Sequence, residues 1–174
     1  MPFAFYERLT QSQQRVYRQS DGVACVAIPR ASDLRSVVDT VQHALASEDR
    51  PRTQAAADRL LAEIAGRLGV PSLRTQVLAV RPSYHWGELH GLYHGAHDGR
   101  SARVSVWMRT AERRQVVKFR TFLRTLLHEL CHHLDYTLLR LADSFHTEGF
   151  YQRESSLLRQ LLPPAPDTTV RTDA

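Results

Sequence analysis

The chain of 174 residues has few cysteines, a single lysine and no long apolar run. Its two cysteines, Cys25 and Cys131, are too few for a disulfide framework and fit a reducing compartment. No apolar run reaches the roughly 18 residues of a membrane-spanning helix. The N-terminal segment also lacks the basic-then-apolar order of a secretory signal. These absences predict a cytoplasmic protein with no membrane-spanning segment.

Arginine carries almost all of the positive charge, because the 23 basic residues include one lysine, Lys118. A net charge of +5 is compatible with a nucleic-acid partner. However, the arginines are scattered from Arg8 to Arg171, and no basic block is longer than Arg113–Arg114. No RNA-binding motif or cysteine finger accompanies them. We therefore interpret the arginine excess as surface composition, and a nucleic-acid partner remains an alternative supported by charge alone.

Length and apolar periodicity predict an α+β fold. We expect one domain over 1–162, with a mainly helical part over 1–70, a core over 71–162 and a disordered tail over 163–174. Its small, mostly antiparallel sheet would pack on the long helix over 116–141 and on the helix that follows. The predicted helices span 33–45, 51–68, 116–141 and 150–162, and residues 1–20 form a short helix or arm. The predicted strands span 73–80, 89–94 and 102–108, and residues 23–28 form a strand or an extended segment.

The longest apolar helical stripe contains His128-Glu129-Leu130-Cys131-His132, an HExxH motif. One helical turn separates His128 from His132, so both imidazoles lie on one helix face and can share a Zn²⁺ ion. Glu129 is placed to take a proton from a water molecule that zinc activates. The motif therefore predicts a zinc-dependent hydrolase with one metal ion.

A catalytic zinc site needs a third protein ligand and one open position. Asp135 lies too far along the helix to ligate, so we expect it to accept a hydrogen bond from a ligand imidazole. The third ligand should come from the next helical segment. His146 follows a break in the helical pattern, where the chain can fold back onto the metal. Glu154 and Glu148 are the two alternatives.

The segments HELCHHLDY and HTEGFYQRE resemble those of the SprT-like zinc metallopeptidases and their gluzincin-like relatives. In that family, HExxH is followed by a loop of about a dozen residues, then by a third histidine and by an aromatic four residues later. Here thirteen residues separate His132 from His146, and Phe150 follows. The resemblance covers residues 73–162. It implies a zincin-like fold for the domain over 1–162, with residues 71–162 as its metal-site core. The cysteine zinc ribbon of many family members is absent, and a gluzincin would use a glutamate such as Glu154 as the third ligand.

The resemblance implies a zinc peptidase that acts on a peptide or protein substrate, with His128, His132 and His146 as ligands and Glu129 as the general base. In some family members the substrates are DNA-associated proteins. Two alternatives therefore remain open, a DNA-associated protease and a zinc-stabilised binding or regulatory protein without turnover. The second would have a closed site with four ligands.

Other residues are candidates for supporting roles around such a site. Tyr93, Tyr136 and Tyr151 supply phenols that could stabilise an oxyanion, and Arg153 could hold a carboxylate. The strand over 102–108 could be a sheet edge that binds an extended peptide. Cys131 is expected to be a buried apolar residue. A second metal site is conceivable in the glycine-rich hairpin, at His85, Glu88, His90, His94 and His97.

Overall fold

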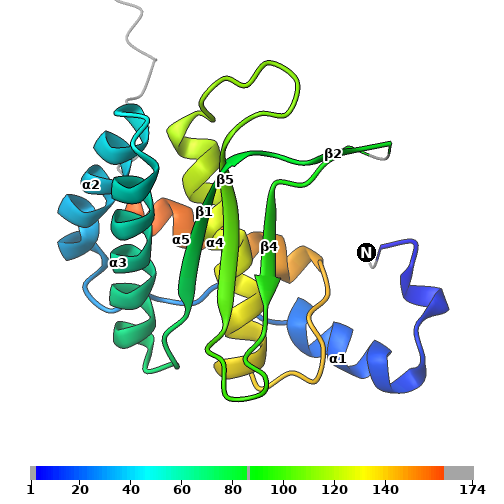
Figure 1. Cartoon of the computed structure of the whole chain (residues 1–174). Coiled ribbons are helices and arrows are strands. Elements are labelled where there is room, and N and C mark those ends of the chain that lie inside the picture. The colour runs from blue at the N-terminus through cyan, green and yellow to red at the C-terminus, as the bar shows by residue number, and fades with distance from the viewer. Residues whose placement is uncertain (1–2, 86, 163–174) are drawn as a thin grey trace, which may run out of the picture.

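The structure is a computed structural model that describes residues 3–85 and 87–162. This part of the chain is α+β, with five α-helices and a small mixed sheet (Figure 1). The predicted tail over 163–174 lies outside the described residues. The helices are α1 (Gln11–Asp21), α2 (Arg35–Ala46), α3 (Arg50–Leu68), α4 (Phe119–Thr137) and α5 (Glu148–Leu161). The strands are β1 (Arg74–Val80), β2 (Ser83–Tyr84), β3 (Gly87–Glu88), β4 (Gly91–His94) and β5 (Arg103–Arg109).

The main sheet has the strand order β1-β5-β4. The predicted hairpin is confirmed, because β4 pairs antiparallel with β5 and Gly91 lies opposite Val106. Strand β1 runs parallel to β5, with Val77 opposite Val106. Two predictions are therefore wrong: the sheet is mixed rather than mostly antiparallel, and the strand over 102–108 is central rather than an edge. Both predictions fail because β5 pairs on its second side with β1, which lies earlier in the chain and is separated from β5 by β2, β3 and β4.

The helices agree with the apolar periodicity, and their ends differ for local reasons. A 3₁₀ turn, η2 (Ala31–Leu34), precedes α2, so this helix begins at Arg35. Helix α4 begins later than predicted, because Val117 donates its N–H to the carbonyl of Met108 and continues as extended chain. The segment over 23–28 is extended. Gln160 of α5 holds it by accepting from the N–H of Ile28 and donating to the carbonyl of Val26.

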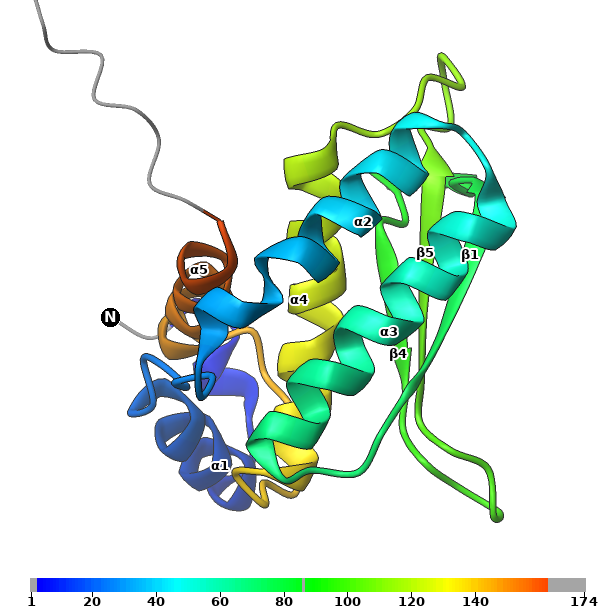
Figure 2. The same ribbon diagram turned by 90° about the vertical axis from the view of Figure 1, so that its left-hand side faces the viewer.

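Helices α2, α3 and α4 form a layer beside the sheet (Figure 2). Helix α3 packs on β1, whereas α4 packs on β4 and β5, so the helix with the HExxH motif lies against the free edge of the sheet. The core joins the inner face of the sheet to these helices through residues such as Val77, Val106, Leu61 and Leu127. Within the described residues, no helix has both the length and the apolarity needed to cross a bilayer.

Helix α5 packs on α4, and the C-terminal end of α1 meets the start of α5. At this junction the N–H of Gly149 donates to the Asp21 side chain. A Cβ atom at Gly149 would overlap the carbonyl oxygen of Asp21 and lie 2.8 Å from that of Ser20. The two helices can therefore approach this closely only because residue 149 is glycine.

We expect Gly149→Ala to lower the free energy of unfolding by about 1–3 kcal/mol, because the added methyl group separates α1 from α5. Gly66→Ala in α3 is the matched control, since a Cβ there meets nothing within 4 Å. That substitution should stabilise the protein by about 0.5–1 kcal/mol through helix propensity. Urea unfolding followed by circular dichroism measures both changes. Equal stability of the two variants would contradict the close packing at Gly149.

Candidate metal centre

Three histidines converge at the surface of α4. His128 and His132 lie one turn apart on this helix, and His146 comes from the loop that leads into α5. The Nε2 atom of His146 lies 3.0 Å from the Nε2 atoms of both His128 and His132. Nitrogen ligands about 2.0–2.1 Å from a tetrahedral zinc ion would be about 3.3 Å apart, close to this spacing. The three side chains therefore fit one metal ion.

The three histidines share a buried aromatic support, and burial favours the neutral form of His132 and His146. The buried Phe150 ring lies beneath them, with centroids 5.0 Å from His128, 4.8 Å from His132 and 5.1 Å from His146. Burial, followed by the neighbouring histidines, lowers the pKa of His132 to about 3. Burial also lowers the pKa of His146. Neutral imidazoles have the free nitrogen lone pairs that a metal ion requires.

The outer nitrogen of His128 is held by α5. Its Nδ1 atom lies 2.9 Å from the carboxylate of Glu154, which can only accept, so Nδ1 carries the proton. This assigns the lone pair to Nε2, which faces the other two histidines. Arg124, one turn before His128 on α4, pairs with the other Glu154 oxygen at 3.4 Å. Glu154 therefore fixes the ring orientation and tautomer of His128.

The outer nitrogen of His132 is held by a longer chain of hydrogen bonds. Its Nδ1 atom lies 2.7 Å from Ser144 Oγ, and Ser144 donates its own proton to Asp135 at 2.6 Å. Ser144 must therefore accept from His132, which again leaves the lone pair on Nε2. The predicted direct hydrogen bond from a histidine to Asp135 is therefore wrong, because Ser144 stands between Asp135 and His132.

Arg153 is fully buried and donates to Asp135 Oδ1 at 2.7 Å. The same guanidinium donates to the carbonyl oxygens of Ser20 and Val23, at the end of α1. Arg153 therefore holds a carboxylate of the protein itself, because this side chain has no exposed surface that a substrate could reach. Its carboxylate partner is Asp135, which it positions beneath Ser144.

Glu129 lies between α4 and β4 and is almost completely buried. The pKa of its carboxyl group is raised to about 7, chiefly by burial and also by the nearby Glu154. The neighbouring His128 and a hydrogen bond from the backbone N–H of Tyr93 act in the opposite direction and lower it. A carboxyl group that titrates near neutral pH can both accept and release a proton. Glu129 thus has the environment of a general base.

Strand β4 lies directly against this carboxylate at Gly91. A Cβ atom at this position would overlap Glu129 Oε1 and lie 2.7 Å from Thr125 Cγ2. A cavity of about 300 Å³ opens here, and its lining includes His90, Gly91, His128, Glu129 and Glu154. Only a residue without a side chain allows the sheet edge to approach Glu129 so closely.

The three candidates for the third ligand occupy different positions. His146 completes the only group of three or more ligand atoms within 4.8 Å of one another that the described residues contain. Glu154 contacts the opposite nitrogen of His128, so it supports a ligand. Glu148 lies at the start of α5, where it accepts from Gln152. The geometry favours His146 as the third ligand.

The phenols are distributed around the cluster. Tyr93 stacks between His132 and Tyr136, and its hydroxyl lies 3.1 Å from Nδ1 of His133. His133 also contacts the carbonyl of Pro71 at 2.7 Å, so this histidine belongs to the scaffold. Tyr151 has a half-exposed ring 5.8 Å from that of His146. Tyr136 and Tyr151 are the candidate phenols with substantial exposure.

The hairpin histidines do not form a second metal site. Within residues 3–85 and 87–162, the group of His128, His132 and His146 is the only one with the spacing of a metal site. Glu88 instead pairs with Arg81 at 3.4 Å, and Nδ1 of His97 contacts the carbonyl of Gly95. Cys131 is fully buried as expected, and its burial raises the pKa of the thiol.

Sequence reasoning missed three residues that shape the centre: Ser144, Arg124 and Gly91. Arg124 could have been found, because it lies four residues before His128 and therefore on the same helix face. Ser144 lies in an irregular loop, and the importance of Gly91 depends on the distance between a strand and a helix. Neither has a signal in the sequence pattern.

Searches of protein-family models, curated proteins and solved structures found no match to this chain. The assignment of the three histidines therefore depends on their geometry and on the motif, and the SprT-like resemblance stays a prediction.

We expect the purified protein to bind one Zn²⁺ ion per chain. His146→Ala should weaken this binding by more than about 100-fold, whereas Ser144→Ala should weaken it by about 10–100-fold, because it releases the outer nitrogen of His132. Competition with a fluorescent zinc chelator measures both affinities. His94→Ala, in the hairpin, is the control and should bind as the wild type does. Unchanged affinity in His146→Ala, together with loss in Glu148→Ala, would overturn the assignment of the third ligand.

Proposed function

We propose that this protein is a zinc-dependent metallopeptidase with a zincin-like site. The observation that carries the proposal is the convergence of three histidine Nε2 atoms beside Glu129, a buried carboxyl group whose pKa is raised to about 7. Three protein ligands leave the fourth tetrahedral position open, as in catalytic zinc sites. Among the described residues no fourth ligand atom joins the group, which argues against a closed structural site.

The chain's own residues supply the rest of the mechanism. Bound zinc would polarise the substrate carbonyl and lower the pKa of a water molecule. Glu129 takes the proton from the attacking water and passes it to the amine of the leaving peptide. Its pKa near neutrality suits both transfers. Glu154 and the Ser144–Asp135–Arg153 chain keep His128 and His132 in one orientation throughout.

The surroundings of the centre suit a polymeric substrate. Two cavities are lined in part by residues of the site, one of about 300 Å³ beside Glu129 and one of about 520 Å³ beside His146. A third, of about 820 Å³, lies beside Tyr93 and Tyr136. Strand β4 pairs on one side only, with β5. Its free backbone groups can therefore bind an extended peptide across the histidines, a role that the sequence assigned to the strand over 102–108.

Glu129→Gln tests the general base. It should keep one zinc ion per chain and reduce kcat by about 10²–10⁴-fold, because the amide cannot take the proton. Cleavage of fluorescein-labelled casein gives the rate, and metal analysis gives the zinc content. Full activity in this variant would contradict the mechanism. A wild-type protein that holds zinc but cleaves neither casein nor a peptide library would overturn the peptidase proposal and favour a zinc-stabilised binding protein.

Gly91→Ala tests the approach of β4 to the general base. The added methyl group should displace the Glu129 carboxylate and lower kcat by about 100-fold, with no change in zinc content. Gly95→Ala, after the same strand, is the control, because a Cβ there makes only ordinary contacts with Tyr93. The casein assay compares the two variants. If both retain wild-type activity, the position of β4 does not matter for catalysis.

A further inference from the structure

The first residues of the described chain form an aromatic arm beside the metal centre. We call residues 3–8 the N-terminal arm; it includes the 3₁₀ turn η1 (Tyr6–Arg8). The N–H of Phe3 donates to the hydroxyl of Tyr17 at 3.1 Å, and the ring of Phe5 packs edge-on against Tyr17 at 5.9 Å. Tyr17 is almost fully buried in α1. The arm is therefore attached to the body of the protein at a defined place.

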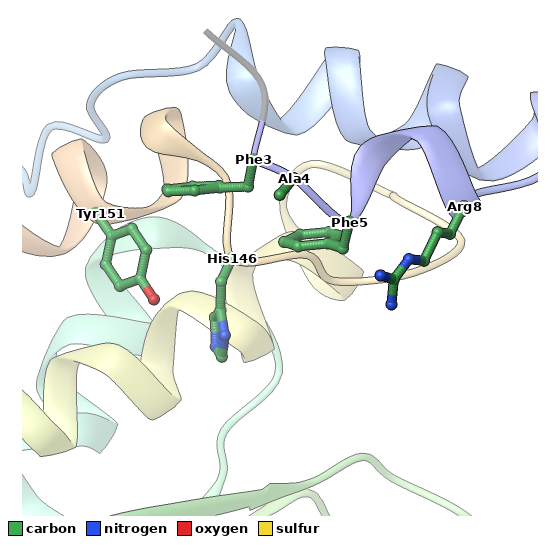
Figure 3. A pocket seen from close by; sticks show the side chains of 6 residues that line it. All are labelled: Phe3, Ala4, Phe5, Arg8, His146 and Tyr151. Carbon is green, nitrogen blue, oxygen red and sulfur yellow. The ribbon is translucent and has the colours of Figure 1, made fainter.

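The arm encloses a hollow of about 520 Å³ that reaches a metal ligand (Figure 3). Its lining consists of Phe3, Ala4, Phe5, Arg8, His146 and Tyr151. Figure 3 shows the two phenylalanines on one side of His146, with Tyr151 and Arg8 at opposite ends. The aromatic walls are only partly covered, because Phe3 is 40%, Phe5 38% and Tyr151 41% exposed. We call this hollow the arm subsite.

We propose that the arm subsite binds a large apolar side chain of the peptide substrate, at a position within two residues of the scissile bond. The proposal rests on the proposed peptidase function and names its substrate class. His146 belongs both to the hollow and to the metal centre, and a peptide advances only about 3.3–3.6 Å per residue. A side chain in the hollow therefore belongs to a residue next to the reacting carbonyl or one position further away.

Size and polarity determine the class of side chain. A hollow of about 520 Å³ has room for a phenylalanine, tyrosine or leucine side chain. Two phenylalanine rings and a tyrosine ring form most of its walls, so an apolar occupant gains by removing their surfaces from water. A charged or small side chain would leave these rings exposed or the hollow poorly filled.

Arg8 adds a charge preference at one end of the hollow. Its side chain is exposed and forms no ion pair with the described residues, whereas the nearby Arg18 bonds to the hydroxyl of Tyr6. A carboxylate on the same peptide, beyond the apolar residue, would pair with this guanidinium. The preferred substrate is therefore a peptide with a large apolar residue near the scissile bond and an acidic residue farther along.

Cleavage of a peptide library, with the cut sites read by mass spectrometry, tests the preference directly. The zinc-loaded wild-type protein should favour Phe, Tyr or Leu at one fixed position within two residues of the cut. Two synthetic peptides that differ only in Phe or Ala at that position then provide a matched pair. Phe5→Ala should lower kcat/KM about tenfold for the Phe peptide and less than about twofold for the Ala peptide. Phe3→Ala, which removes the other phenylalanine wall, should have the same selective effect.

Binding provides a second readout that does not require cleavage. The fluorescein-labelled Phe peptide, titrated by anisotropy into the zinc-loaded Glu129→Gln variant, should bind about tenfold more weakly when Phe5→Ala is added. Arg8→Glu should weaken binding of a peptide with a downstream Glu several-fold more than Arg15→Glu does, a matched charge reversal on α1. Library cleavage without apolar preference, or a preference that survives both Phe5→Ala and Phe3→Ala, would overturn the arm subsite. Absence of any cleavage would instead overturn the peptidase function, and the binding pair would still test the subsite.

Discussion

The buried ion pair between Arg153 and Asp135 is the interaction on which the geometry of the histidine cluster depends. Both side chains are completely buried, and the arginine also bonds to the carbonyls of Ser20 and Val23 at the end of α1. Burying two charges is costly, and the cost is offset only when geometry and additional hydrogen bonds are good. Here these bonds join α1, α4 and α5 at one point, with Asp135 directly beneath Ser144. The position of His132 is therefore tied to the packing of three helices.

Two neighbouring residues of α5 support two histidines of α4 through different chemistry. Glu154 accepts directly from His128, whereas Arg153 acts on His132 through Asp135 and Ser144. Any rotation of α5 against α4 would disturb both connections at once. Helix α5, which contributes none of the three histidines, thereby determines the tautomer of the two histidines in the motif, and the aromatic ring of Phe150 on the same helix supports all three rings.

Local patterns in the sequence predicted the helices and the hairpin and revealed the HExxH motif, because each depends on residues a few positions apart. The spacing of His128 and His132 determines their common face, and the break before His146 indicated where a third ligand could return. The order of the strands could not be predicted in this way, since β1 pairs with β5 across an intervening hairpin. Nor could the role of Arg153, because its partners lie 18 and 133 residues away along the chain. Charge and position alone could not separate a buried structural arginine from one that binds substrate.

The 133 residues of chain that separate Ser20 from Arg153 also govern when the histidine cluster can form during synthesis. A ribosome adds about 5–20 residues per second, and N-terminal segments emerge first. The HExxH helix leaves the ribosome before α5, so for several seconds His128 and His132 lack Glu154, Arg153 and the platform of Phe150. The hydrogen bond across 133 residues closes only after α5 has emerged and α1 has docked on it. A nascent chain thus cannot hold the three histidines in their final geometry until synthesis has passed α5.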